Sequence, residues 1–207
     1  MEHDRTARDR ILDATLAAAA DHGIARLSVG DVAHLAGLSR QTLYKYFPSK
    51  QALVSEAVAR EAADVVRQVV SAAERFDDPG EALFAGVFTT LSVARDHPLL
   101  DRLLRTEPES ILGVLIAPDG PVVGLARTAI DEITAARFAE VPPSRRAVAA
   151  DALARLLVSY AVGPPDVPPE ELARSLTSMI IGGVLEPGVA EDAKSAGTAP
   201  TVTAPTG

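Results

Sequence analysis

The sequence has no cysteine and no tryptophan, and aromatic residues make up only 4% of its 207 residues. The absence of cysteine excludes disulfides and thiolate metal sites, and it fits a reduced, cytoplasmic compartment. Apolar residues still account for 47% of the chain, carried mainly by Ala, Leu and Val. Because such residues favour helices packed on helices over a sheet, we expect an all-α fold.

Long apolar runs and catalytic motifs are also missing. No stretch reaches the roughly 18 uninterrupted apolar residues of a membrane helix, and no signal-peptide pattern follows the charged first residues, so we expect no membrane partner. Phosphate-binding, dinucleotide-binding, hydrolase and metalloprotease signatures are absent. His3 and His97 are isolated and lack the spacing of metal ligands. We therefore expect a protein that is not an enzyme and has no metal or other cofactor.

The net charge of -8 argues at first against a nucleic-acid partner. The distribution of the charge along the chain, however, favours such a partner. Within residues 1–50, seven Lys and Arg oppose six Asp and Glu, a balance of +1, so the rest of the chain carries -9. The acidity therefore belongs to the C-terminal three-quarters, and the N-terminal part is able to present a cationic face to DNA.

Apolar periodicity and helix punctuation predict a series of helices. Ser28, Ser39 and Ser49 are good N-caps, and Gly and Pro mark most of the helix ends. The expected helices cover 4–22, 28–37, 40–47, 49–76, a stretch from Gly80 to the break at His97-Pro98, 99–116 as one helix or two, 122–139, 144–162 and 170–182. Beyond Pro187 no apolar periodicity continues, which predicts a disordered tail over 188–207.

Two short predicted helices joined by a tight turn at Gly37 are typical of a helix-turn-helix. Val32, Ala33 and Leu35 are expected to form the buried side of the first helix. Leu43 and Phe47 lie four residues apart and are expected to face the core together from the second helix. The polar side chains of that second helix then project outwards.

Residues 25–53 carry a pattern that resembles the DNA-binding domain of TetR-family regulators. The matching features are Ser28, Val32-Ala33, Ala36-Gly37-Leu38-Ser39, Leu43-Tyr44-Lys45-Tyr46-Phe47 and Ser49-Lys50 with Leu53. The sequence departs from the common pattern at Arg40-Gln41, where small residues are frequent in the family. The resemblance implies a three-helix DNA-binding domain over 1–50 and a helical bundle for ligand binding and dimerisation over 51–187.

The resemblance and the groove chemistry together predict the DNA contacts. Arg40 suits guanine and Gln41 suits adenine, although both could simply be solvated. Tyr46 could instead be half buried in the core, and Lys50 also lies at a helix N-terminus, where phosphate binds readily. The predicted DNA-binding residues are Ser28, Ser39, Arg40, Gln41, Thr42, Tyr44, Lys45, Tyr46 and Lys50.

By the same resemblance, the last two long helices form a four-helix dimer interface. Its predicted residues are Ala152, Arg155, Leu156, Ser159, Leu172, Ser175, Leu176, Met179 and Ile180, of which Leu156, Leu176 and Ile180 could belong to the subunit core as well. A ligand cavity is expected between the helices. Its predicted lining is Phe84, Phe88, Leu91, Leu104, Leu112, Leu115, Ile116, Phe138 and Leu157, which could equally be ordinary core.

The aliphatic lining suits an apolar small molecule or an acyl chain. Glu107 and Glu109, either side of a proline, are interpreted as a solvated loop rather than as paired acids. We expect a ligand-released repressor whose dimer places two recognition helices about 34–36 Å apart on a near-palindromic operator. The alternatives are an activator, a ligand-binding protein whose helix-turn-helix no longer binds DNA, and a helical enzyme.

Overall fold

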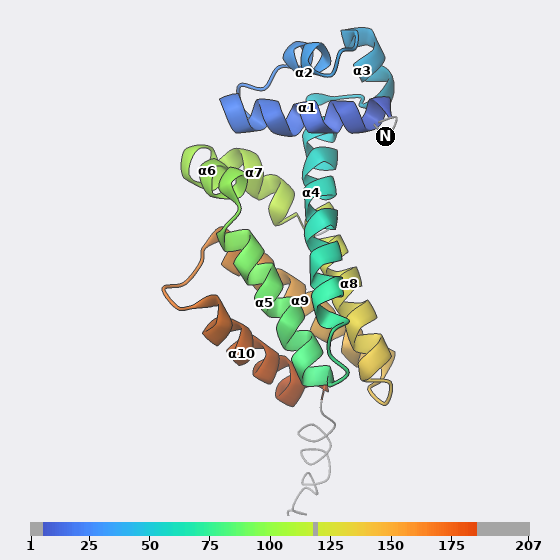
Figure 1. The fold of residues 1–207 in the computed structure, drawn as a ribbon, viewed down its shortest axis with the longest axis vertical. Helices are drawn as coiled ribbons and strands as arrows, with labels where there is room; N and C mark the ends of the chain where they lie inside the picture. The colour runs from blue at the N-terminus through green and yellow to red at the C-terminus, as the bar shows by residue number, and fades with distance from the viewer. Residues whose placement is uncertain (1–5, 118–119, 186–207) are drawn as a thin grey trace, which may run out of the picture.

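The computed structural model describes residues 6–117 and 120–185, and within these ranges the chain is all helix and turn, as predicted. In Figure 1 the first three helices form a cap at one end, a bundle forms the other, and one long helix runs from the cap into the bundle. The helices are α1 (Ala7–His22), α2 (Val29–Leu35), α3 (Arg40–Tyr46), α4 (Lys50–Ala73), α5 (Pro79–Arg95), α6 (Pro98–Thr106), α7 (Pro108–Leu115), α8 (Pro121–Arg137), α9 (Pro143–Val162) and α10 (Pro169–Ile180), followed by a π-helical turn, η1 (Ile181–Leu185).

Side-chain oxygens begin each of the first four helices. Ser28, Ser39 and Ser49 accept hydrogen bonds from backbone N–H groups of α2, α3 and α4, as the sequence predicts, and Thr6 does the same for α1. Each such cap satisfies donors that the first turn leaves without a helical partner. The boundaries of these helices are therefore set by local sequence.

In the three-helix unit of α1, α2 and α3, the predicted inward face of α3 is confirmed. Leu43 is fully buried and Phe47 is 2% exposed. The expected burial of Leu35 is wrong, since its side chain is 58% exposed. On α2 the inward positions follow the i, i+3, i+4, i+7 rule from Val29, and Leu35 falls on the opposite side. The inward residues are Val29, Val32, Ala33 and Ala36.

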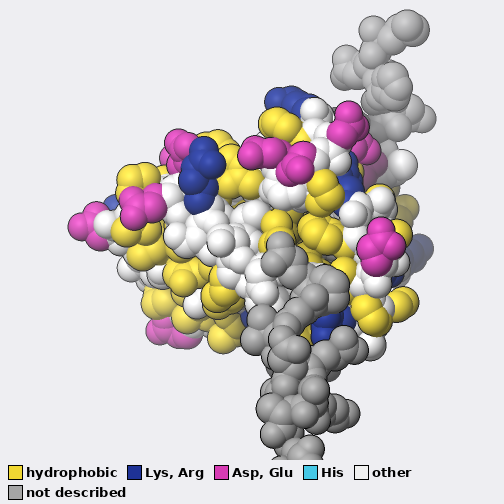
Figure 2. All heavy atoms as spheres, turned by 90° about the horizontal axis from the view of Figure 1, so that it is seen from below, with side chains coloured by type: hydrophobic (Ala, Val, Ile, Leu, Met, Phe, Trp, Pro, Cys, Tyr) yellow, Lys and Arg dark blue, Asp and Glu magenta, His cyan; other side chains and the backbone are white. Residues whose placement is uncertain are grey.

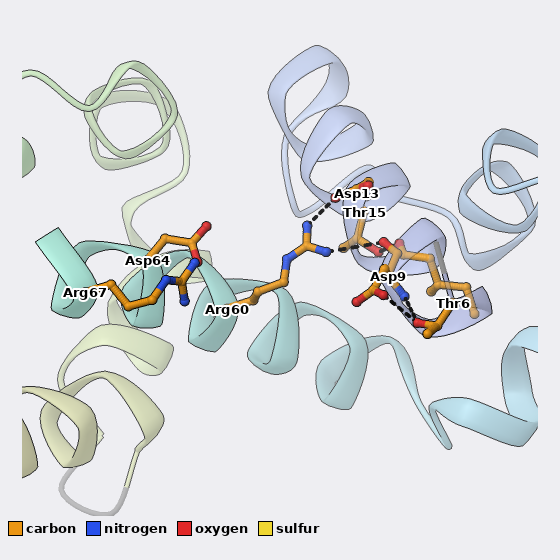
Figure 3. Close-up of polar contacts among 8 residues, drawn as sticks. Thr6, Asp9, Asp13, Thr15, Arg60, Asp64 and Arg67 are labelled. Atoms are coloured by element: carbon orange, nitrogen blue, oxygen red, sulfur yellow. Dashed lines mark hydrogen bonds and ion pairs between the residues drawn. The ribbon is translucent and has the colours of Figure 1, made fainter. Parts of the chain in front are cut away.

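Arginines hold helix α4 near its middle and at its C-terminal end. Near the cap, Arg60 of α4 donates to the Asp13 carboxylate at 2.6 Å and to the Asp9 carbonyl at 3.2 Å, which ties α1 to α4 (Figure 3). At the far end, Arg137 of α8 donates to the carbonyl oxygens of Ala73 and Phe76. The Phe76 carbonyl lies just beyond the end of α4, where the guanidinium gives it a hydrogen-bond partner, and the Ala73 carbonyl also accepts from the N–H of Phe76 at 3.2 Å.

The bundle is built from α5, α8, α9 and α10 around a core that includes Leu83, Leu153 and Leu176. The last helix continues past its predicted end at Gly182-Gly183 as η1, and Leu185 is 1% exposed. Burial of a leucine outweighs the weak helix preference of two glycines. The predicted tail over 188–207 lies outside the described residues.

Helices α6 and α7 are short, and each begins with a proline at a position that tolerates one. They lie beneath α1, between the cap and the bundle (Figure 1). Within the described part of the chain, none of the helices combines the length and apolar character that crossing a membrane requires.

Candidate DNA-binding surface and ligand cavity

The turn between α2 and α3 is closed by its backbone. Gly37 has a φ of 66°, a left-handed conformation that favours glycine. Its N–H donates to the His34 carbonyl at 3.0 Å, and the N–H of Leu38 donates to the Ala33 carbonyl at 2.9 Å. The turn therefore fixes the angle at which α3 leaves α2.

The outer face of α3 carries the polar side chains that the sequence predicts. Arg40, Gln41, Tyr44 and Lys45 are all exposed, at spacings of one, four and five residues, which place them on one face. The guanidinium of Arg40 lies 5.9 Å from the centre of the Tyr44 ring. Tyr46 is 42% exposed rather than half buried in the core. A helix with a buried back and a polar outer face is suited to the major groove.

The hydroxyl groups among the predicted DNA contacts have local partners. Ser28 accepts from the N–H of Gly30 at 3.1 Å, and Ser39 accepts from the N–H of Thr42 at 3.0 Å. The hydroxyl oxygens of Ser39 and Thr42 are 2.8 Å apart. The structure thus gives Ser28 and Ser39 a capping role, and their contact with DNA stays a prediction.

Lys50, the first residue of α4, contacts the loop between α1 and α2. Its ammonium group donates to the carbonyl oxygen of Ala25, in the loop between α1 and α2, at 2.9 Å. The side chain is half-buried, so a phosphate contact of Lys50 stays a prediction. Sequence reasoning missed Arg8, which lies 5.2 Å from the centre of the Phe47 ring and pairs with Glu56. Neither of these contacts leaves a short-range sequence signal.

An apolar cavity of about 180 Å³ lies between α4, α5, α6, α7, α8 and α9. Valine, alanine, leucine and isoleucine dominate its lining, and the polar side chains in its wall are Glu61, Thr90 and His97. Leu16 of α1 also lines it, so a helix of the cap reaches the cavity directly.

The predicted ligand residues are distributed over several places. Leu115 and Leu157 line the apolar cavity, whereas Leu91 and Leu104 line a second cavity of about 260 Å³ that also includes Tyr160. Phe84 and Phe88 stack on each other at 5.9 Å between ring centres, and Arg174 of α10 lies over Phe84. Ile116 is 53% exposed, while Leu112 and Phe138 are half-buried and line neither cavity.

His97 and Glu61 form the polar corner of the apolar cavity. The Nδ1 atom of His97 accepts from the N–H of Leu100 at 3.2 Å, which assigns the ring proton to Nε2 in the neutral form. The Nε2 atom lies 3.5 Å from a carboxylate oxygen of Glu61, a separation longer than a good hydrogen bond. The sequence assigned His97 no role, because its cap contact and its Glu61 neighbour come from different elements.

The predicted dimer residues occupy two environments on α9 and α10. Leu176 and Ile180 are 4% and 2% exposed and belong to the subunit core. Ala152, Leu156 and Leu172 are half-buried, and the exposed residues are Arg155, Ser159, Ser175 and Met179. Arg155 donates to Asp151 at 2.8 and 3.2 Å, and this hydrogen bond lowers the pKa of that carboxyl below its usual value.

Seen from the end farthest from the cap, the bundle mixes apolar side chains with acidic and basic ones (Figure 2). This end therefore lacks the single positive field that a nucleic acid would need, at least over the surface that the described residues form in this view. Helix α3 lies at the opposite end of the molecule (Figure 1).

Two family models match the chain. Residues 11–57 match the model described as bacterial regulatory proteins, tetR family, and residues 78–181, just over half of the chain, match the C-terminal domain of the bacterial tetracyclin repressor. An HTH-type transcriptional regulator of Mycobacterium tuberculosis is 32% identical over 127 residues, which are 61% of this chain and 63% of that relative. The match thus spans less than two thirds of the relative.

Of two further comparisons, the first covers a part of the chain and the second covers most of it. The HTH-type transcriptional repressor KstR of Rhodococcus jostii is 50% identical over 54 residues, 26% of each protein. The crystal structure of the TetR family repressor AlkX from a Dietzia strain, implicated in biodegradation of n-alkanes, has a TM-score of 0.70 and 25% identity. That comparison covers 87% of this chain and 98% of the other.

Proposed function

The chain belongs to the TetR family of bacterial regulatory proteins, and from this membership we propose that it is a dimeric transcriptional repressor released from its operator by an apolar small molecule. The observation that carries the proposal is the outer face of α3. Arg40, Gln41, Tyr44 and Lys45 are exposed there above a buried Leu43. Arginine and glutamine are the side chains that read guanine and adenine edges in the major groove.

A dimer would set the distance between the two α3 recognition helices. Two copies joined through α9 and α10 would place their recognition helices about 34–36 Å apart, in successive major grooves of a near-palindromic operator. The exposed residues Arg155, Ser159, Ser175 and Met179 support this surface, together with the membership of a family in which dimers are typical. Because its partner is DNA, we propose that the protein acts in the cytoplasm, without enzymatic activity.

The inducing ligand is proposed from the apolar cavity. Its lining is almost entirely aliphatic, which favours an apolar molecule over a sugar or nucleotide. The link of the similar AlkX repressor with n-alkane degradation agrees with this class of ligand. A ligand that prefers a dimer with a different spacing of its reader helices would shift the population away from DNA.

The test is binding of the purified protein to the DNA that flanks its own gene, at two salt concentrations and against random competitor DNA. We expect tight, salt-dependent binding that survives the competitor. Arg40→Ala should cost about 1–3 kcal/mol on the operator and relax base preference. Arg75→Ala, an exposed arginine near the far end of α4, is the matched control and should leave specificity intact.

Binding no better than to random DNA, or equal losses of specificity from Arg40→Ala and Arg75→Ala, would contradict the proposal. In the first case a ligand-binding protein whose reader no longer recognises DNA becomes the better interpretation. A screen of random-sequence DNA would then separate a distant operator from a reader with no operator.

A further inference from the structure

Glu107 joins the ligand-binding part of the molecule to the DNA reader. It lies at the junction of α6 and α7, and its Oε2 atom accepts a hydrogen bond from the backbone N–H of Ala25 at 2.7 Å. Ala25 lies in the loop that connects α1 to α2, 82 residues earlier. The carbonyl oxygen of the same Ala25 accepts the hydrogen bond from Lys50 at the start of α4. One loop residue is thus held by Glu107 on one side and by Lys50 on the other.

The loop is shaped to receive this carboxylate. Gly23 has a φ of 83°, and a Cβ built at this position would collide with the carboxylate of Glu107. The backbone conformation therefore favours a glycine, and the missing side chain leaves room for the acid. A second hydrogen bond joins α6 to α1: Arg102 of α6 donates to the carbonyl of Asp21 in the last turn of α1 at 3.0 Å. A cation at the carbonyl end of a helix is favourable.

The other side of the same junction forms the cavity wall. Leu99, Leu100 and Leu103 of α6 line the apolar cavity, and so do Ile111 and Leu115 of α7. Glu107 sits between these two short helices. A ligand that displaces either helix therefore moves the residue that holds Ala25.

We propose that Glu107 is a positioning residue for DNA recognition: through Ala25 it holds the α1–α2 loop and the ammonium group of Lys50 in the arrangement that binds the operator. The inference rests on the proposed function, and it adds a residue outside the DNA-binding helices to the determinants of operator affinity. Filling the cavity shifts α6 and α7, breaks the Glu107–Ala25 bond and loosens the Lys50 end of the reader.

Simple electrostatics predicts the opposite sign, which makes the proposal testable. Removing an acidic side chain near DNA should leave binding unchanged or strengthen it, because repulsion of the phosphates falls. Glu109, two residues further on, is exposed and offers a control with the same charge. Glu109→Ala should therefore keep or slightly raise operator affinity, whereas Glu107→Ala should lower it.

The experiment measures operator affinity and its salt dependence for Glu107→Ala, Glu107→Gln, Glu109→Ala, Lys50→Ala and the Glu107→Ala/Lys50→Ala double variant. We expect Glu107→Ala to weaken binding about tenfold, the value of one charge-assisted hydrogen bond, and to reduce the salt slope by up to about one. Glu107→Gln keeps an acceptor oxygen and should stay within about threefold of wild type. The double variant should lose no more than Lys50→Ala, since both changes act through Ala25.

Wild-type affinity and slope in Glu107→Ala, or additive losses in the double variant, would overturn the inference. If Glu107→Ala does not fold, Glu107→Asp replaces it: the shorter side chain keeps the charge but withdraws the carboxylate from Ala25, and it should weaken binding in the same way. If the wild-type protein binds no specific operator, the proposed function is wrong. The affinities of the variants are then compared on random DNA, where Lys50 should still contribute to binding. Wild-type protein that binds no DNA at all overturns both.

Discussion

The guanidinium of Arg60 and the carboxylate of Asp13 lie 2.6 Å apart and join α4 to α1 across 47 residues of sequence (Figure 3). The same guanidinium donates to the carbonyl of Asp9, so it bridges one turn of α1. The Arg60 side chain is 26% exposed, which shields the pair partly from solvent. This contact holds the first helix of the reader on the helix that leads to the cavity.

Arg60→Ala should lower the free energy of unfolding by about 1–2 kcal/mol, since hydrogen bonds to a charged group are lost at a partly shielded site. Arg67→Ala is the control, because Arg67 pairs with Asp64 inside α4 and is largely exposed. Denaturant unfolding followed by circular dichroism measures both. Equal stability of the two variants would show that the bridge between α1 and α4 contributes nothing beyond a surface pair.

Ligand selectivity should follow from the carboxylate in the cavity wall. Glu61 disfavours an anionic ligand, whereas a hydroxyl group is able to donate to it, so 1-octanol should bind more tightly than octanoate by about tenfold. Glu61→Gln should narrow that difference by improving octanoate binding. Calorimetry on the wild type and Glu61→Gln gives both affinities. Preference for octanoate in the wild type would contradict this reading of the cavity.

The proposed dimer surface can be tested at one exposed apolar residue. Met179→Glu places a charge on the α10 face, where the wild-type side chain is 51% exposed in the single chain, and should raise the dimer dissociation constant at least tenfold. Ile116→Glu makes a similar change at the residue that follows α7, which is 53% exposed. Sedimentation velocity should give monomer for the first variant only. Dimers that persist in Met179→Glu would move the interface away from this face.

The pair of Asp151 and Arg155 predicts a small pH dependence of stability. The hydrogen bond from Arg155 lowers the pKa of Asp151 below 3.8, its ordinary value. A carboxyl with a depressed pKa stabilises the fold above its ordinary pKa, and this contribution disappears as pH falls through the lower folded value. Asp151→Asn should thus be slightly less stable than wild type at pH 7 and equal to it in strong acid. Thermal unfolding at pH 7 and below pH 3 checks the sign.

Local sequence determined the helix starts and the outward face of α3. Ser28, Ser39 and Ser49 act within three residues of themselves, and Leu43 with Phe47 is enough to decide which side of α3 is buried. These features depend on helical periodicity and capping, which operate over a few residues. The fold class and the location of the reader could therefore be predicted without the tertiary structure.

Only the tertiary structure decided which partners the outward residues meet. Periodicity gives the direction of a side chain on its own helix but not the element that lies opposite, so the sequence left Glu107 on a solvated loop and Lys50 directed to phosphate. The packing of α6 and α7 beneath α1 brings Glu107 to Ala25 and Lys50 to the other side of that residue. The residues predicted to line the cavity lie in several places for the same reason. An apolar side chain fits a core and a cavity wall equally well, and only the packing of the helices shows which of the two it lines.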